Sequence, residues 1–314
     1  MKRYLLNRLL ILIPVMLGVC FITFLMVELT PGDPAEIILL KRDIGVTPEA
    51  LAVARRQLGM EGPVLQRFIN WLGRAARGDL GYSYTSGEAV AKEIFRRLPA
   101  TLELAAGGLL VMLFLALSLG ILAALFPRTA IDHLSRLTAL LGASLPSFYL
   151  GLLLICYLAV PSPYLQVMGL GGLSHLLLPS LTLGFGLAAV YARLLRSSLL
   201  EVLQLDFIRA ARARGLREAM VIGKHALRNA LIPLVTVFGI TVGGLLGGTV
   251  VVEQVFAWPG VGRLAVQAIF DRDIPVIQGY ALFMALIYVL VNLAVDISYR
   301  YLDPRIKLGR KETG

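Results

Sequence analysis

Apolar residues fill six separate stretches of this chain, and polar residues gather in the connections between them. A helix that crosses a bilayer needs about 20 mostly apolar residues, because each helical residue rises about 1.5 Å. All six stretches reach that length, and they cover residues 9–29, 100–126, 134–160, 175–195, 230–252 and 274–295. The pattern therefore predicts an all-α membrane protein, a single domain over residues 1–314 with six transmembrane helices.

Composition supports the membrane assignment. Of the 314 residues, 57% are hydrophobic and only 16% are charged, and the mean hydropathy is +0.77. Soluble domains carry about a quarter of their residues as charged types. The first stretch is too long for the apolar part of a signal peptide and no cleavage site follows it, so we expect it to remain as a span. Cys20 and Cys156 lie in apolar stretches, at a spacing that fits neither a disulfide framework nor a thiolate metal site.

The basic residues predict the orientation of the chain. Four segments fall on one side of the membrane if six spans alternate: residues 1–8, 127–136, 193–228 and the tail from 300. Their net charges are +3, +1, +5 and +3. Short positive connections stay in the cytoplasm, so both termini are expected there. This topology explains the pI of 9.9, and a nucleic-acid partner is not needed to account for it.

The opposite side has one long connection, residues 30–99, which is predicted to be external. It holds two amphipathic helical patterns. The first begins at Thr47 as N-cap with Pro48 at the first helical position, and it stops at Gly59. The second, residues 63–78, places Phe68 and Trp71 on one helical face. These helices either form a structural cap on the helix bundle or provide a docking surface for an external partner.

A basic segment, residues 196–229, separates the fourth and fifth apolar stretches. Phe207, Ala210, Ala211 and Arg214 recur at one-face helical spacing, and Gly215 is a C-terminal stop before a second helical pattern. Two short helices joined at a glycine would make a compact protrusion, continuous with the spans on either side. The alternative is a pair of basic amphipathic helices resting on anionic lipid headgroups.

Several function classes find no support in the sequence. The phosphate-binding pattern G-x-x-x-x-G-K-[ST] is absent, and the three histidines, His133, His175 and His225, do not have metal-ligand spacing. Catalytic and metal-ligating residues are therefore predicted to be absent from this chain. An ion-coupled secondary transporter or channel remains the alternative of a different class. Such a protein would need ionisable groups deep in its spans. The candidates, among them Glu28, Glu103, Glu253, Arg193 and Arg196, lie near helix ends, where they serve as interfacial anchors or partners of neighbouring helices.

Glycine, proline and tryptophan residues suggest further sites. Gly239, Gly243 and Gly247 form a small-residue stripe on the fifth span, which fits close packing within the chain or an interface or pore wall. Pro146 is expected to kink the third span. Glu103 is a candidate for lining a path. Trp258 fits an interfacial anchor, and Pro259 with Gly260 fits a tight turn, so these three are candidates for external docking.

The basic segment also carries a family resemblance. "RAARARG" followed by "HALRNALIP" resembles the cytoplasmic coupling loop of binding-protein-dependent ABC importer permeases, in its peptide/nickel-class form. Ala210, Ala211 and Gly215 stand at matching positions, whereas Arg209 replaces the usual glutamate. The resemblance extends along nearly the whole chain through "TPGDP", "GDLGYSY", "RLPATLELA", "LGASLPSFYLG", "FAWPGVGRLAVQAIFDRDIPVIQG" and "DPRI".

The resemblance implies a type I ABC importer permease fold and a set of partners. These are a second, homologous permease in a heterodimer, two ATPase subunits that bind ATP and Mg, and an external solute-binding protein, all at the inner membrane of a prokaryote. It implies no enzyme activity and no cofactor for this chain. The residues implied to couple with the ATPases are Asp206, Phe207, Arg209, Ala210, Ala211, Arg214, Gly215, His225 and Arg228.

The cargo depends on finer resemblances. "TLELA", "GGLSHLLLPS" and "YARLLRSSLLEV" are most similar to nickel-transport permeases, so nickel, as an ion or a chelate, is the expected cargo. Dipeptide and oligopeptide permeases share much of this pattern, and peptide uptake by the same machinery is the alternative.

Overall fold

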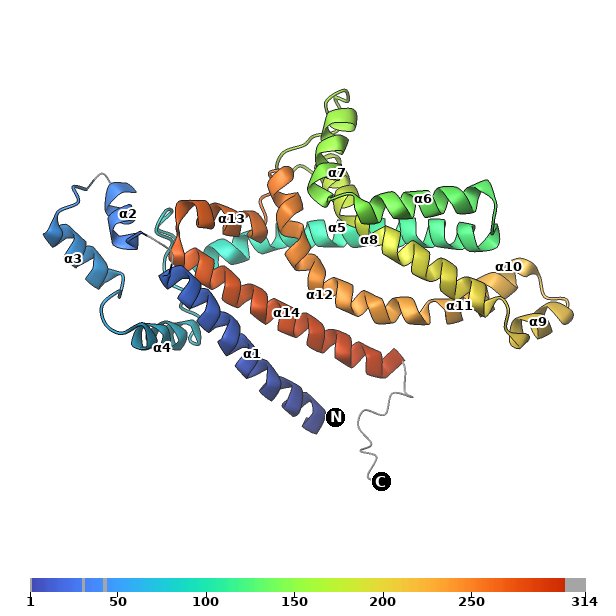
Figure 1. Ribbon diagram of the computed structural model, residues 1–314, viewed down its shortest axis with the longest axis horizontal. Coiled ribbons are helices and arrows are strands. Elements are labelled where there is room, and N and C mark those ends of the chain that lie inside the picture. Colours follow the sequence, from blue (N-terminus) through green and yellow to red (C-terminus); the bar gives the residue numbers. More distant parts are fainter. Residues whose placement is uncertain (1, 30–31, 42–43, 303–314) are drawn as a thin grey trace. The chain divides into compact units, whose positions relative to one another are not determined.

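The computed structural model describes residues 2–29, 32–41 and 44–302. Within these residues the chain is helical, apart from one isolated antiparallel bridge between Tyr82 and Ala89. Figure 1 shows the helices in chain order. They are α1 (Lys2–Glu28), α2 (Pro34–Lys41), α3 (Pro48–Gln57), α4 (Val64–Ala75), α5 (Val90–Leu125), α6 (Ala130–Ser144), α7 (Ser147–Leu154), α8 (Leu173–Val202), α9 (Asp206–Ala213), α10 (Glu218–Met220), α11 (Leu227–Ala230), α12 (Ile232–Val255), α13 (Val261–Asp271) and α14 (Ile274–Leu302), with π-helical segments η1 (Ile155–Ala159) and η2 (Val221–Ala226).

The long apolar helices agree with the predicted spans, except at the first span, in α1, and at the third, in α6 and α7. Among the described residues, four segments are long and apolar enough to cross a membrane: Val90–Leu125, Leu173–Val202, Glu218–Leu245 and Ile274–Val295. A fifth span arises if the bent pair α6 and α7 is counted as one. The first predicted span, residues 9–29, lies almost entirely in α1, and its described apolar stretch is Ile13–Met26. The all-α fold class is confirmed, and the count of six spans stays a prediction.

The third predicted span departs from a single kinked helix. It is broken between α6 and α7, which meet at an angle of 110°. Leu145 is extended, with φ −80° and ψ 125°, because the proline ring that follows disfavours a helical conformation there. Pro146 then starts the next helix, and its carbonyl accepts a hydrogen bond from Leu150 N–H at 3.0 Å. The expected kink at Pro146 is therefore a complete break.

The structure divides into two compact units. Of the described residues, those up to 99 and 263–293 form the first unit, and 100–262 with 294–302 form the second. Helices α5, α13 and α14 contribute residues to both. The motif "DPRI" at residues 303–306 and the first two residues of "TPGDP" lie outside the described residues.

In the first unit, the predicted amphipathic helix α4 packs against α1 and α14. Phe68 and Trp71 are buried against Phe24 of α1, with ring centroids 5.5 and 6.2 Å from the Phe24 ring, and Leu282 of α14 joins them. Arg67 on the same helix donates to Glu28 at 2.7 Å. Helix α4 thus covers α1 and α14, and docking of an external partner on its exposed face stays a prediction.

The preceding helix α3 begins as its sequence predicts. The Thr47 side chain accepts a hydrogen bond from Ala50 N–H at 3.2 Å, and Pro48 occupies the first helical position. Gly59 follows the helix with φ +65°, a conformation that glycine adopts without strain. A small apolar cluster of Ala35, Leu39 and Ala54 joins α2 to α3.

In the second unit, glycines let α5 and α6 lie close to α8. A Cβ atom at Gly184 of α8 would be 2.6 Å from the Gly108 carbonyl oxygen of α5. One at Gly142 of α6 would be 2.9 Å from the Ala189 Cβ atom of α8. Transmembrane helices commonly pack through such small residues, because dispersion contacts between backbones replace a hydrophobic driving force.

Candidate functional site

The basic segment follows α8 and is built from short helical pieces. Helix α9 is followed by a turn at Gly215, and then α10, η2 and α11 run on into α12. The first predicted helix and the glycine stop are confirmed. The second helical pattern is not one regular helix, because six of its residues, Val221–Ala226, adopt π-helical hydrogen bonding. Such π segments often occur at functional positions.

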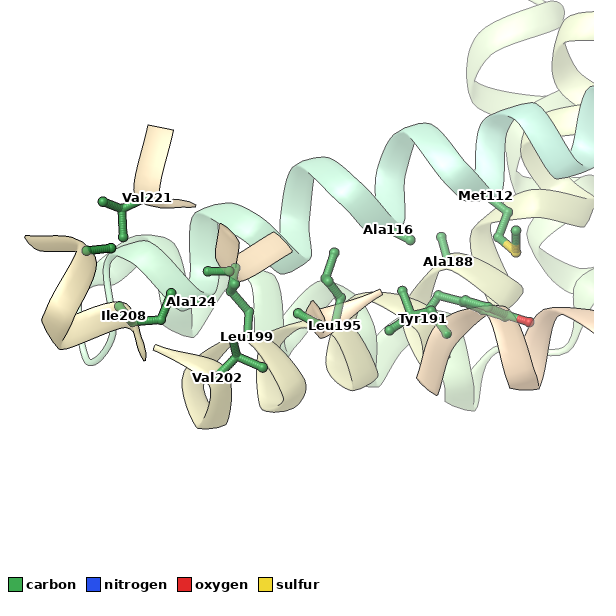
Figure 2. Close-up of a cluster of buried hydrophobic side chains, with 14 residues drawn as sticks. Met112, Ala116, Ala124, Ala188, Tyr191, Leu195, Leu199, Val202, Ile208 and Val221 are labelled. Atoms are coloured by element: carbon green, nitrogen blue, oxygen red, sulfur yellow. The ribbon is translucent and has the colours of Figure 1, made fainter. Parts of the chain in front are cut away.

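One face of the segment is buried against the spanning helices. Ile208 and Ala211 of α9 and Val221 of η2 join a cluster that includes Leu199 of α8 and Ala124 of α5. Figure 2 shows Ile208 and Val221 at one end of this cluster, with Ala124, Leu199, Val202 and Leu195 beside them. Ile208 and Val221 have no exposed surface. The buried face of the segment is thus packed against the ends of α5 and α8.

The other face of α9 is open to a partner. Phe207 keeps 43% of its surface exposed, and Arg209, Ala210 and Arg214 are exposed as well. The sequence predicted that Phe207, Ala210, Ala211 and Arg214 share one face of the helix. This is wrong for Ala211, which is buried in the cluster, whereas its neighbour Ala210 is exposed. Consecutive residues on an α-helix are about 100° apart, so Ile208 and Ala211 share the buried side. An exposed aromatic ring beside guanidinium groups is a surface suited to a protein groove.

The other candidates for coupling differ in exposure. Asp206 is almost fully exposed, with 97% of its side-chain surface accessible, and its carboxylate is 3.4 Å from Arg209. His225 is half-buried in η2, and Arg228 is exposed on α11. An exposed surface thus runs from α9 across η2 to α11.

The turn at Gly215 is closed by an ion pair. Arg212 donates to Glu218 from Nη2 at 2.6 Å and from Nε at 3.1 Å, which joins the end of α9 to the start of α10. Both side chains are exposed, so this pair shapes the turn more than it stabilises the fold. Gly215 itself has φ +75°, and a Cβ atom there would meet nothing within 4 Å. The turn therefore requires glycine for its backbone conformation and not for space.

A cavity of about 340 Å³ lies among α6, α7, α8 and α12 in the second unit. Its hydroxyl groups come from Ser147, Thr182 and Thr241, in a lining that is otherwise apolar or glycine. Thr241 Oγ1 accepts a hydrogen bond from the Tyr191 hydroxyl at 2.7 Å. Thr182 and Thr241 were not predicted as site residues, because a hydroxyl in an apolar helix ordinarily hydrogen-bonds to its own backbone and gives no distinct signal in the sequence.

The predicted path residues have mixed positions around this cavity. Pro146 lies between the lining residues Leu145 and Ser147. Gly239 and Gly243 of the small-residue stripe are buried, whereas Gly247 is exposed with open space around it. The glycines that line the cavity are Gly142, Gly186, Gly244 and Gly248. Glu103 is exposed on α5 and is not part of the lining.

The predicted docking residues at 258–260 belong largely to the interior. Trp258 is 1% exposed, and its Nε1–H donates to the Ala100 carbonyl at 2.8 Å. Gly260 is buried, and a Cβ atom there would lie 2.2 Å from the Glu253 carboxyl carbon. Pro259 is half-buried. The assignment of Trp258 and Gly260 to external docking is wrong, because an indole with a buried hydrogen-bond acceptor is a core residue.

Glu253 is the charged centre of this interior region. Its side chain is fully buried, and Oε1 accepts a hydrogen bond from Thr101 Oγ1 at 2.8 Å. Thr101 Oγ1 in turn accepts from Val261 N–H at 2.9 Å. The Thr101 hydroxyl thus joins α5, the end of α12 and the start of α13. Glu253 is confirmed as a partner of a neighbouring helix.

Replacing Thr101 with valine is expected to destabilise the protein by about 1–3 kcal/mol, because the buried Glu253 carboxylate and Val261 N–H lose a partner while the side-chain volume is kept. The measurement is the unfolding midpoint of the purified protein in detergent. Thr101→Ser retains the hydroxyl and should lie close to wild type. Equal stability of the valine and serine variants would contradict this role of the hydroxyl.

Comparison with known proteins identifies the family. Residues 116–308 match the family described as the inner-membrane component of binding-protein-dependent transport systems, and residues 1–105 match the N-terminal membrane component of the same systems. The chain belongs to this permease family. The permease is a multi-pass inner-membrane subunit of a bacterial ABC importer, and the ATPase activity of such importers lies in separate partner subunits.

The permease is similar to named relatives over nearly its full length. It is 42% identical over 311 residues to the glutathione transport system permease protein GsiC of Escherichia coli K12, covering 98% of this chain and 99% of the relative. The GsiC protein of Salmonella typhimurium LT2 matches with the same identity and coverage. Among solved structures, an inward-facing form of the MetNI methionine ABC transporter matches with a TM-score of 0.55 and 21% identity, over 67% of this chain and 96% of that chain. The structural match supports the type I ABC importer permease fold.

Proposed function

We propose that this permease imports short peptides of the glutathione kind. The observation that carries this proposal is the 42% identity, over 98% of the chain, to permeases named for glutathione transport. The sequence alone favoured nickel and kept peptides as the alternative. The relatives support the peptide alternative, and nickel becomes the second candidate.

The proposed machine contains a second permease, two ATPase subunits and an external solute-binding protein. In it, the exposed face of the basic segment docks on an ATPase. Two features support this role: Phe207 and Arg214 are exposed, and Ile208 on the opposite side is fixed in the cluster shared by α5 and α8. A displacement of the docked face would therefore move both spanning helices. ATP and Mg bind to the partner subunits and not to this chain.

The proposed orientation places both termini and the basic segment in the cytoplasm. The net positive charge of these segments supports it, as does the positive-inside rule. The region 30–99 is then external, on the side from which a binding protein delivers cargo. A cysteine introduced at Arg77 would react with a membrane-impermeant thiol reagent added outside intact cells, whereas one at Arg214 would not.

The proposed translocation path includes the cavity bounded by Ser147, Thr182 and Thr241. Its glycines, Gly244 and Gly248, leave open space on α12, and Gly247 lies beside them on the exposed surface. We assign this surface to the second permease subunit, with the path enclosed between the two chains. Its three hydroxyl groups can donate to or accept from the amide and carboxylate groups of a peptide.

The test is uptake of labelled glutathione, a labelled dipeptide and labelled nickel in cells that carry or lack this gene beside its partner transporter genes. Gene-dependent uptake of glutathione or the dipeptide, with nickel uptake unchanged, is the expected result. Gene-dependent nickel uptake that excess peptide does not suppress would overturn the peptide proposal and restore the nickel one. A Gly215→Val permease is the matched control, because it should be inserted but inactive for any cargo.

A further inference from the structure

A second cavity lies in the first unit, among α1, α3, α4 and the start of α14. Its volume is about 520 Å³, which falls within the roughly 300–1,000 Å³ typical of small-molecule sites. Apolar side chains form part of its wall, including Leu58, Met60, Leu80 and Ile274. The cavity belongs to the region 30–99 and its neighbours, and it is separate from the cavity assigned to the translocation path.

Charged groups of both signs line this cavity. Asp33 and Glu28 are present, and each is held by an arginine: Arg55 Nη2 lies 2.6 Å from Asp33 Oδ2, and Arg67 Nη1 lies 2.7 Å from Glu28 Oε1. Glu28 Oε1 accepts the hydrogen bond from Arg67. The two ion pairs fix the wall and position carboxylate oxygens at the cavity.

Helix α4 supplies a third cation that has no such pairing. Arg67, Trp71 and Arg74 are spaced at i, i+4 and i+7, so they share one face of α4, and all three line the cavity. Arg74 is exposed, and no carboxylate pairs with it in the part of the chain that the structure describes. Trp71 is 7% exposed, and its Nε1–H is buried without an acceptor among the described residues. This wall therefore presents one free guanidinium and one orphan donor.

Tyr84 adds a neutral hydroxyl to the same cavity. Burial raises the pKa of Tyr84 to about 12, and the nearby Asp273 carboxylate adds to the rise. The positive charges of Arg74 and Arg67, which line the same cavity, lower this pKa and so act in the opposite direction. At neutral pH the phenol keeps its proton and remains a hydrogen-bond donor. Arg74, the Trp71 indole and the Tyr84 hydroxyl thus give this part of the wall three hydrogen-bond donors beside the two ion pairs.

We propose that this cavity binds a short zwitterionic peptide, with the terminal carboxylate of the peptide on Arg74 and its ammonium group near Glu28. A carboxylate supplies the acceptors that the Arg74 guanidinium, the Tyr84 hydroxyl and the Trp71 indole require, and a charge-assisted pair with arginine is strong because two parallel hydrogen bonds form. The apolar wall receives the side chains of the peptide. The site rests on the peptide reading of the proposed function, and it lies outside the path, where it would retain peptide released at the external face.

The test is calorimetric titration of the purified full-length permease in lipid nanodiscs with trialanine and with trialanine amide, which lacks the terminal carboxylate. Wild type is expected to bind trialanine saturably and the amide about tenfold more weakly, because the charge-assisted contact is lost. Arg74→Gln should weaken trialanine binding by about tenfold. Arg77→Gln is the matched control, since Arg77 is an exposed arginine just beyond α4 that does not line the cavity.

Two outcomes would overturn the site. One is an absence of saturable trialanine binding to wild type at millimolar concentration. The other is equal weakening by Arg74→Gln and Arg77→Gln, which would show a general effect of surface charge. Glutathione titrated in the same way extends the result to a relevant peptide. Because binding is measured without ATP or transport, a failed titration beside gene-dependent peptide uptake would remove this site and leave the proposed function intact.

Discussion

Replacing Asp132 with alanine is expected to destabilise the permease by about 3 kcal/mol, the lower end for a broken buried ion pair, because it leaves the half-buried Arg196 guanidinium without its partner. Asp132 of α6 has no exposed surface, and Arg196 of α8 donates to both of its oxygens, at 2.7 and 2.9 Å. Arg128 N–H donates to the same carboxylate at 2.9 Å. This carboxylate thus holds the start of α6 against α8, the helix that leads into the basic segment.

The measurement is the free energy of unfolding in lipid nanodiscs or detergent, with cellular abundance as a second readout. The matched control is Glu61→Ala, which removes an exposed partner of Arg56 at 3.4 Å and should cost less than about 1 kcal/mol. Asp132→Asn keeps the shape of the side chain and one acceptor, so it should fall between the two. An Asp132→Ala protein as stable as Glu61→Ala would show that the buried pair does not hold the helices together.

Local rules in the sequence predicted the helices and several of their ends. Thr47 caps α3, and Gly215 ends the turn after α9, because capping and positive φ depend on residues close in the chain. The break at Pro146 was underestimated, although the rule for residues before proline applies to Leu145. The extended conformation at Leu145 allows a bend, but the angle of 110° depends on the packing of α7 against distant helices.

Interactions between distant segments could not be predicted from the sequence. Trp258 has its acceptor at Ala100, 158 residues away, and Glu253 has its donor at Thr101, 152 residues away. A tryptophan near a helix end fits an interfacial anchor and a buried core residue equally well. The prediction of which side of α9 is buried was wrong for a related reason. Ala210 and Ala211 are alike in size, and only the packing of Ile208 decides which of them faces inward.

The turn at Gly215 is expected to control how the basic segment meets the ATPases. Gly215→Val is expected to reduce cargo-stimulated ATP hydrolysis by about tenfold or more, within the range of coupling free energies between sites. Gly215 has φ +75°, which costs other residues about 1–2 kcal/mol. The strained turn would relax by shifting α9 against α10, and the exposed face that includes Phe207 would move out of register with its partner. The permease itself should still insert, because Gly215 has open space around it.

Two controls separate backbone conformation from bulk. Asparagine tolerates positive φ, so Gly215→Asn should retain most of the stimulation although it adds a side chain. Gly223→Val introduces the same valine into the same segment, at a position with open space and without a positive φ, and should remain coupled. ATP hydrolysis is measured in reconstituted transporter with its binding protein, with and without cargo. If Gly215→Val were stimulated like wild type, or if Gly223→Val failed equally, the turn geometry would not be what transmits the ATPase movement. The predicted order of activities, wild type and Gly223→Val above Gly215→Asn and all three above Gly215→Val, arises only if the conformation at Gly215 sets the position of α9.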